Sequence, residues 1–582
     1  MNRRDLRRKN IYKLLFFVSI LIIINILAQY AFFRIDLTSE KRYTLSKITK
    51  NHLKNLQGSV YVKVYLDGPE LPVGYKRLKN AIKEQLDEFE VYAGTNLDYT
   101  FINPSESNDK DVRFALYKEL YDKGIKPIEI NSQDQSKTTK TMIFPSAVIT
   151  YTVSVPIQNS NPQRDTVILR EIGLSLLKTN ANLSAEDEQN IFYSIENLEF
   201  ELLNAIHKLS QINKPQIAFV EGHNEVPELE LADISYALSE YFDVRRGAIN
   251  GREGVLDKFA AVIIAKPTLP FSEKDKYILD QYIMNGGRVL WLIDGVSVDM
   301  DSLLEYPVTV AVPNELNLSD MLFKYGVRIN TNLVADLQCA PIGLATSETG
   351  TDSKIQLFPW MYFPLLLSPN THATTRYLSY VKTEFASTID TVGLMKGVQK
   401  KLLLFTSQFT KRINTPAPVS FDNIYQKPDP GQFRLKNLPV AVLLEGNFES
   451  AFLNRPVKMF TNSPENLIEQ SKLAKIIVVA DGDIIRNGVS PKGEPYPLGF
   501  DRNAQTTFTG NKEFIVNALN YLCDQSDIMS LRNREIKVRL LNKKKVLAEK
   551  SQWKIFNVLF PLVLMALFGL GIVVVRRRKY TR

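Results

Sequence analysis

The chain has 582 residues and a formal net charge of +9 at neutral pH. Basic residues crowd both termini and the segment 532–554, and the remainder of the chain is net acidic. Nucleic-acid binding needs clustered positive charge on the folded body, so this class of function is excluded. Only two cysteines, Cys339 and Cys523, and four histidines occur. A disulfide scaffold and a zinc site are therefore not expected, and the spacing of the two cysteines does not decide whether they are bridged or free.

The first predicted element is a transmembrane helix over residues 14–33, behind a short basic tail, residues 1–13. These twenty residues carry no charge and would extend about 30 Å. The alternatives are a buried core helix and a cleaved signal peptide, but the apolar run exceeds the roughly 7–15 residues of a signal peptide. Asn25 and Gln29 lie four residues apart on one helix face. We expect them to contact a membrane partner, the alternative being tolerated polar residues without a role.

Alternating strand and helix signals follow within residues 34–175. Strands are predicted at 60–66, 97–102 and 128–130, helices at 75–92 and 112–121, and a closing hairpin from 142–151 and 166–169. This order predicts a small thioredoxin-like α/β domain. Because no Cys-x-x-Cys occurs, such a domain would have no redox activity. Segment 184–214 contains a long amphipathic helix, which we interpret as a connector to the second block.

A larger α/β domain is predicted over residues 215–530. Its strands at 216–220, 260–265 and 288–293 are almost wholly apolar and alternate with helices at 231–241 and 272–285. Such strands are typical of a parallel sheet covered on both faces. Residues from about 343 to 433 break this pattern and are interpreted as an insertion. The sheet is predicted to resume with strands at 440–444 and 475–480, before a final helix at 513–523.

The C-terminal end repeats the membrane pattern of the N-terminal end. A basic juxtamembrane segment, 531–554, leads into a second transmembrane helix, 555–575, and a basic tail, 576–582. Gly569 and Gly571 remove side-chain bulk there, which favours contact with another membrane helix. The positive-inside rule predicts both tails in the cytoplasm and a two-pass protein of the inner membrane with its body in the periplasm. The basic segments would meet anionic membrane lipid or simply be solvated.

Polar residues follow the predicted parallel strands, and four are predicted to bind a ligand: His223, Glu225, Asp294 and Asp481. In open α/β sheets, ligands bind beyond the carboxyl ends of the strands. A histidine among carboxylates could act as a base or bind a metal, while the alternative is an ordinary solvated loop. No P-loop and no Gly-x-Ser-x-Gly elbow occurs. We therefore assign no catalytic residue, no metal and no cofactor.

Two further features, an aromatic cluster and a cysteine, each have a functional and a structural interpretation. The aromatic cluster with Trp360, Tyr362 and Phe363 is predicted either as a docking patch for a protein or as core beneath a loop. Cys339 could be a nucleophile, but it lacks a glycine-flanked elbow, and a buried inert thiol is the more common case.

Taken together, the sequence resembles the GldG family of gliding-motility proteins. The order of tail, anchor, body, anchor and tail carries this resemblance, as do a basic stretch at 532–545 and four motifs: Arg42-Tyr43-Thr44-Leu45-Ser46, Tyr65-Leu66-Asp67-Gly68-Pro69, Glu221-Gly222-His223-Asn224-Glu225 and Gly286-Gly287-Arg288-Val289-Leu290-Trp291.

The resemblance implies an auxiliary, substrate-binding-like subunit of an ABC transporter that works with a separate ATPase and a separate multispanning permease. It also implies a role in gliding motility and its associated protein secretion. The middle domain of that family resembles class I glutamine amidotransferases and an intraflagellar-transport protein domain. Here Asp294-Gly295 follows the strand 288–293 where a catalytic cysteine would stand, which argues against amidotransferase chemistry.

We therefore expect a non-enzymatic component of a membrane complex. The alternatives are a binding module for a glycan or peptide outside the cytoplasm and a cryptic hydrolase that uses the carboxylates at the sheet edge.

Overall fold

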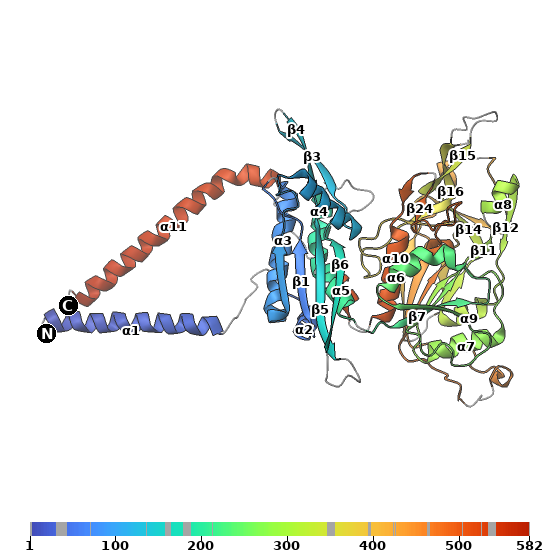
Figure 1. Ribbon diagram of the computed structural model, residues 1–582, viewed down its shortest axis with the longest axis horizontal. Coiled ribbons are helices and arrows are strands. Elements are labelled where there is room, and N and C mark those ends of the chain that lie inside the picture. Colours follow the sequence, from blue (N-terminus) through green and yellow to red (C-terminus); the bar gives the residue numbers. More distant parts are fainter. Residues whose placement is uncertain are drawn as a thin grey trace. The chain divides into compact units, whose positions relative to one another are not determined.

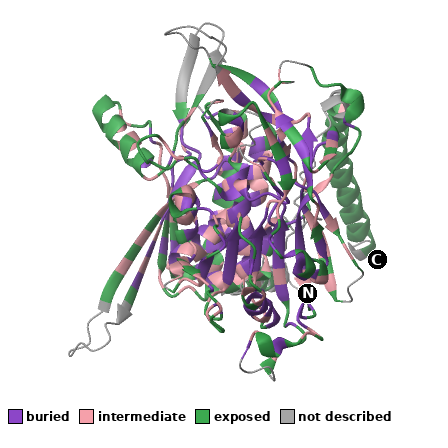
Figure 2. Ribbon diagram, turned by 90° about the vertical axis from the view of Figure 1, so that its right-hand side faces the viewer, coloured by how far each residue is buried: buried purple, intermediate pink, exposed green. Residues whose placement is uncertain are grey.

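The computed structural model describes residues 3–30, 44–69, 71–134, 137–156, 165–178, 188–211, 213–298, 300–345, 355–393, 397–422, 424, 427–461, 466–502, 504–524, 527–533 and 543–580. The chain divides into two compact units, Met1–Arg534 and Glu535–Arg582. Within the first unit, two sheets organise two hydrophobic cores, and buried residues gather on the strands (Figures 1 and 2).

The N-terminal sheet has four strands in the order β2-β1-β5-β6: β1 (Ser59–Val64), β2 (Leu97–Phe101), β5 (Ser146–Pro156) and β6 (Asp165–Ser175). β1 is parallel to β2 and antiparallel to β5, and β5 and β6 form the predicted hairpin. Four helices accompany the sheet: α2 (Lys47–Lys54), α3 (Val73–Ala93), α4 (Lys110–Asp122) and α5 (Glu188–Ser210). The expected strand at 128–130 lies outside this sheet, in a separate hairpin of β3 (Ile128–Asp134) and β4 (Lys137–Ile143).

The helix interpreted as a connector is part of this N-terminal core. Leu198, Leu202, Leu203 and Ile206 of α5 are buried in the same cluster as Val62 of β1. Their spacing places them on one helix face, which needs an apolar surface to cover it. The sheet and α3 supply that surface, because α3 and α5 pack against each other.

The second domain contains a mixed seven-stranded sheet in the order β19-β22-β23-β10-β9-β7-β8. Its strands are β7 (Gln216–Glu221), β8 (Asp243–Ala248), β9 (Ala261–Ala265), β10 (Val289–Leu292), β19 (Val398–Phe405), β22 (Pro439–Gly446) and β23 (Ala474–Val479). The neighbours from β8 to β23 pair in parallel, as the apolar runs predicted. The last two pairings, β23 with β22 and β22 with β19, are antiparallel.

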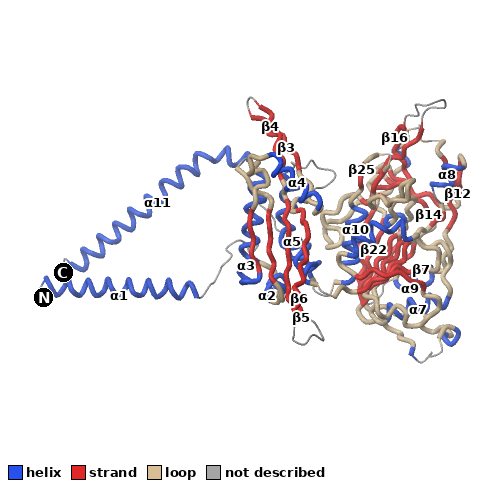
Figure 3. The backbone as a smooth tube through the Cα atoms, viewed as in Figure 1, coloured by secondary structure: helices blue, strands red, loops and turns tan. Residues whose placement is uncertain are grey.

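Helices cover both faces of this sheet (Figure 3). They are α6 (Ala232–Ser239), α7 (Glu273–Met284), α9 (Ser319–Tyr325) and α10 (Gly510–Cys523). α6 and α10 contact each other, and α10 also contacts β9, β10 and β23. α7 begins after Ser272, whose hydroxyl caps it by accepting a hydrogen bond from the backbone N–H of Asp275, and it ends before Asn285. These bounds agree with the predicted helix at 272–285.

The segment interpreted as an insertion contributes to the main sheet, because β19 pairs along its length with β22. The rest of it, together with the preceding residues, forms smaller antiparallel sheets. These contain β11 (Val296–Ser297), β12 (Val308–Pro313) and β21 (Ala417–Ser420); β13 (Val327–Ile329) and β18 (Ile389–Thr391); β14 (Asn332–Asp336) and β20 (Thr410–Asn414); and β15 (Cys339–Ala345), β16 (Ile355–Leu366) and β17 (Val381–Lys382). Further elements are α8 (Met300–Glu305), β24 (Phe500–Asp501) and β25 (Thr506–Thr507).

Two helices carry the predicted anchors: α1 (Arg3–Tyr30) and α11 (Lys543–Tyr580). Among the described residues, α11 contains one segment, Ala548–Arg578, that is long and apolar enough to cross a membrane. The apolar part of α1, Ile11–Asn25, is shorter, and residues 31–33 of the predicted first span lie outside the described residues. The chain is thus compatible with membrane anchoring at its C-terminal helix.

Candidate functional site at the carboxyl edge of the large sheet

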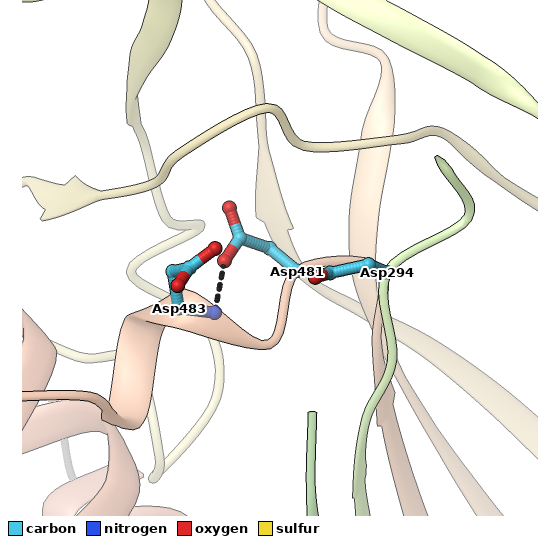
Figure 4. A group of neighbouring side chains, drawn as sticks. All are labelled: Asp294, Asp481 and Asp483. Carbon is cyan, nitrogen blue, oxygen red and sulfur yellow. Dashed lines mark hydrogen bonds between the residues drawn. The ribbon is translucent and has the colours of Figure 1, made fainter. Parts of the chain in front are cut away.

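Three aspartates meet where neighbouring parallel strands end. Asp294 follows β10, while Asp481 and Asp483 follow β23, which pairs with β10. One carboxylate oxygen from each lies within 4.8 Å of the others. Figure 4 shows Asp481 and Asp483 on one segment and Asp294 on the other. Parallel strands bring their carboxyl ends to the same edge, which is why residues nearly two hundred positions apart come together here.

Backbone N–H groups hold two of these carboxylates. Asp481, which is fully buried, accepts hydrogen bonds from the backbone N–H groups of Asp483 at 2.7 Å, Ile484 at 3.2 Å and Glu384 at 2.8 Å. Asp294 accepts one from the backbone N–H of Gly482 at 2.5 Å. The turn after β23 therefore wraps around its own carboxylate, so that side chain is positioned by the fold itself.

Lys266, which directly follows β9, brings the positive charge. Its ammonium donates a hydrogen bond to Asp483 and lies 3.4 Å from Asp294 Oδ2. Burial alone would lower the pKa of Lys266, but Asp483 and Asp294 raise it above its ordinary value. The ammonium thus remains charged at any physiological pH and acts as the cation of the cluster.

Burial dominates the titration of the carboxylates. It raises the pKa of Asp294 to about 6, while Lys266 opposes the shift. The pKa of Asp481 is raised well above its ordinary value by burial, and then by the negative charges of Asp483 and Asp294. Asp481 therefore retains a proton more strongly than an exposed aspartate.

The Lys266 ammonium and the raised pKa values of Asp294 and Asp481 make the cluster poorly suited to a metal ion. Metal-binding carboxylates must be deprotonated, and a divalent cation would have to displace the ammonium of Lys266. Lys266 pairs with Asp483 and Asp294, while the Asp481 carboxylate is held by backbone N–H groups. We therefore treat the cluster as positioning and stabilising the sheet edge.

His223 and Glu225 also lie together, but in a different group. Glu225 accepts a hydrogen bond from the backbone N–H of His223 at 2.8 Å, and its second oxygen lies 3.1 Å from His223 Nδ1. The Nε2 atom is 3.5 Å from Asp275 Oδ2, and the ring stacks on Phe271 with centroids 3.6 Å apart. The imidazole is 5 % exposed, so it is enclosed by its partners rather than presented to a ligand.

The cleft at this edge of the sheet is not lined by the residues that were predicted to bind a ligand. A cleft of about 400 Å³ is lined by Lys266 and Asp483 together with Glu230, Glu384 and Arg486. Neither His223 nor Asp294 is among its lining residues. β9 separates the strands that precede His223 and Asp294. The four predicted ligand-binding residues thus fall into two groups and do not converge on one pocket.

Sequence reasoning missed Lys266, Glu384 and Arg486. The signal for Lys266 was present, because a charged residue directly follows a wholly apolar strand. Glu384 comes from the segment interpreted as an insertion, and it reaches the cleft only through long-range folding.

The predicted docking patch requires a correction. Trp360 is 2 % and Phe363 is 4 % exposed, and both belong to a hydrophobic cluster beneath the small sheets, with Tyr362 packed against it. Trp360 contacts the rings of Tyr362 and Phe421 at centroid distances of 5.2 Å each. The aromatic cluster is therefore core, the second of the two interpretations, because β16 turns these side chains toward neighbouring strands.

The remaining predicted residues are placed as follows. Both cysteines are free, and burial raises the pKa of each thiol to about 12, which keeps the reactive thiolate scarce. Asn25 donates a hydrogen bond to the carbonyl of Leu21 within α1 at 3.4 Å, and the Gln29 side chain lies outside the described residues. A side chain added at Gly569 or Gly571 would meet open space within the second unit.

Comparisons with known proteins match both parts of the chain. The family model described as "ABC-type uncharacterized transport system" matches residues 214–518, more than half of the chain. A domain of unknown function, DUF7088, matches residues 39–150. An uncharacterized protein from Borreliella burgdorferi is 20 % identical over 558 residues, covering 92 % of each chain.

Two solved structures resemble parts of the fold weakly. The mmIFT52 N-terminal domain is 12 % identical, covering 56 % of this chain and all of that chain, with a TM-score of 0.30. An exo-beta-1,4-mannosidase from Opitutaceae bacterium strain TAV5 is 10 % identical, covering 58 % of this chain and 40 % of that chain, with a TM-score of 0.21. Scores this low assign neither fold nor activity. The family match, by contrast, extends over the whole seven-stranded sheet, and the chain therefore belongs to the ABC-type transport auxiliary family that the model describes.

Proposed function

We propose that this protein is a non-enzymatic, membrane-anchored auxiliary subunit of an ABC transporter. Its partners would be a separate ATPase and a separate multispanning permease. The observation that carries the proposal is the family match over residues 214–518, in a chain whose C-terminal helix is long and apolar enough to cross a membrane. The order of motifs resembling the GldG family supports a role in gliding motility and its associated protein secretion.

The ionisable groups at the sheet edge support a role without catalysis. Lys266 pairs with Asp483 and Asp294, and His223 is held by Glu225 and Asp275. A general base must reach a substrate proton, and an enclosed imidazole 5 % exposed has little access to one. The cluster is better suited to stabilising the body than to hydrolysis.

We further propose a two-pass topology with the body in the periplasm. Both tails are short and basic, and such tails remain in the cytoplasm. The N-terminal domain would be a redox-inactive thioredoxin-like module. Its strand order β2-β1-β5-β6, with β1 and β2 parallel and the hairpin antiparallel, supports that assignment. The second domain would be amidotransferase-like, supported by its flanked parallel strands.

The test is to purify the full-length protein from native membranes and identify the chains that co-purify. The proposal expects an ABC ATPase and a multispanning permease in stoichiometric amounts. Replacing residues 555–575 by a polyleucine span should keep membrane insertion while reducing co-purification if the helix recognises the permease. Recovery of the protein without any transporter subunit from membranes that contain an intact transporter would contradict the proposal.

Catalysis is tested separately with His223→Ala and Asp294→Asn in cells. Transport or motility should persist at matched protein abundance, since a loss of about 1–2 kcal/mol of stability alone lowers abundance several-fold. Loss of function with unchanged abundance and complex formation would favour the cryptic hydrolase instead.

A further inference from the structure

A polar cleft of about 540 Å³ lies between α5, α10 and the loop around residues 366–380. Its lining is rich in tyrosine and asparagine side chains, including Tyr193, Tyr377, Asn204 and Asn517. A cleft of this size falls within the roughly 300–1,000 Å³ typical of small-molecule sites. It lies apart from the carboxyl edge of the sheet, because none of the three clustered aspartates lines it.

Arg532 supplies to this cleft a guanidinium group with unsatisfied hydrogen-bond donors. It belongs to the short 3-10 helix η7 (Ile528–Asn533) and lies with its guanidinium carbon 5.3 Å from the Phe200 ring. Its Nη2 donates a hydrogen bond to the carbonyl of Arg376 at 2.8 Å. Its Nε and Nη1 atoms are buried, and no acceptor within the described part of the chain bonds to either. Buried donors without an acceptor are unfavourable, so an acceptor supplied by a bound ligand would stabilise this arrangement.

The other cations of the cleft are already neutralised. Lys178 lies 2.9 Å from Glu201, and Lys512 lies 2.6 Å from Asp233. Arg532 has no carboxylate within ion-pair distance among the residues that the structure describes. A negatively charged group that enters the cleft would therefore find its binding partner at Arg532.

We propose that this cleft binds the carboxylate of a small organic ligand through Arg532. Carboxylates form strong charge-assisted hydrogen bonds with guanidinium groups. A single negative charge is favoured over a doubly charged phosphate because Glu201 and Glu513 also line the cleft and would repel further charge. The tyrosine rings and asparagine amides suit either the residues next to a peptide C-terminus or the hydroxyl groups of a sugar acid.

The site would connect a ligand to the membrane segment along the chain. Arg532 belongs to the basic stretch 532–554, which leads along the chain to α11. Ligand binding is measured on the isolated protein without co-purifying partners, so its outcome is independent of the proposed transporter role.

The test measures binding to the full-length protein in detergent by calorimetry. The probes are an N-acetylated tripeptide with a free C-terminal carboxylate, the same peptide as its C-terminal amide, and glucuronate. We expect the peptide acid or glucuronate to bind, which identifies the source of the carboxylate, and the amide to bind at least about ten-fold more weakly than the acid. Equal binding of acid and amide, or no binding of either acid at millimolar concentration, would overturn the proposal.

Arg532→Gln, with a matched control variant and a second variant of the cleft, assigns the site. Arg532→Gln should weaken binding of the acid probe by about ten-fold or more, whereas Arg328→Gln, at an arginine that is 55 % exposed and paired with Asp390, should not change it. If Arg532→Gln fails to fold by thermal unfolding, Asn520→Asp carries the test, because it adds a negative charge to the cleft lining without removing the guanidinium. Unchanged affinity in the folded variant would exclude the site.

Discussion

Replacing Lys266 by Met should destabilise the protein by about 3–5 kcal/mol, the range for removing one partner of a buried ion pair. Methionine preserves most of the volume of the side chain but removes its ammonium. The lysine side chain is only 17 % exposed, and its charge is shared between Asp483 and Asp294. Without it, Asp294 would lose the cation that lies 3.4 Å away, and Asp483 would keep the more distant Arg486 at 3.7 Å.

The destabilisation caused by Lys266→Met should depend on pH. Burial raises the folded-state pKa of Asp294 from 3.8 to about 6, so its protonated form is favoured by folding. The corresponding stability of about 3 kcal/mol is fully present below pH 3.8 and is lost as the pH rises through 6. Lys266 opposes this shift, so its removal raises the pKa of Asp294 further. The Lys266→Met variant should therefore approach the wild type at low pH and diverge from it as the pH rises.

The assay is denaturant unfolding of the full-length protein in detergent, followed by the fluorescence of the buried Trp291 and Trp360 across the pH range. Lys324→Met is the matched control, because Lys324 pairs with Glu449 at 2.7 Å while 38 % exposed, and such a surface pair contributes less than about 1 kcal/mol. The double variant Lys266→Met/Asp483→Asn should recover part of the loss. If Lys266→Met costs no more than the control, the charge-compensated cluster is not what stabilises this edge.

Two further changes test the core of the second domain and a half-buried histidine. Asp280→Ala should destabilise the protein by about 3 kcal/mol in the same unfolding assay. Tyr325 Oη, Ser450 Oγ and the backbone N–H of Ala451 all donate hydrogen bonds to its buried carboxylate and would lose their acceptor. A loss below about 1 kcal/mol would contradict a stabilising role for these hydrogen bonds. Burial lowers the pKa of His207 from 6.5 to about 4, so stability from its neutral form is lost as the pH falls through that window. His207→Phe should reduce the acid sensitivity between these pH values, and an unchanged pH profile would exclude a contribution from His207.

Local patterns predicted much of the fold correctly. The apolar runs at 260–265 and 288–293 became the parallel strands β9 and β10, with both faces covered. The run at 440–444 also became a buried strand, but β22 is antiparallel to its neighbours. An apolar run reports burial on two faces and contains no information about strand direction, which depends on the path of the preceding chain.

The candidate site could be predicted only in part, because local sequence patterns do not reveal which strands are neighbours in the sheet. Asp294 and Asp481 were predicted at the same sheet edge, and adjacent parallel strands place them there. His223 was grouped with them, yet β9 lies between the strands that precede His223 and Asp294. Strand order is a property of long-range pairing, so chain order alone could not separate the two groups.

The sequence by itself determined the elements whose causes are local: the cap at Ser272, the apolar stripe of α5 and the uncharged length of α11. Only the tertiary structure decided which surface covers α5, where Trp360 points, and that Lys266 is the cation of the aspartate cluster. Capping, helix periodicity and hydropathy act over a few residues, whereas these contacts join segments separated by tens to hundreds of residues. Their geometry is specified by packing of the whole domain and not by any single stretch of it.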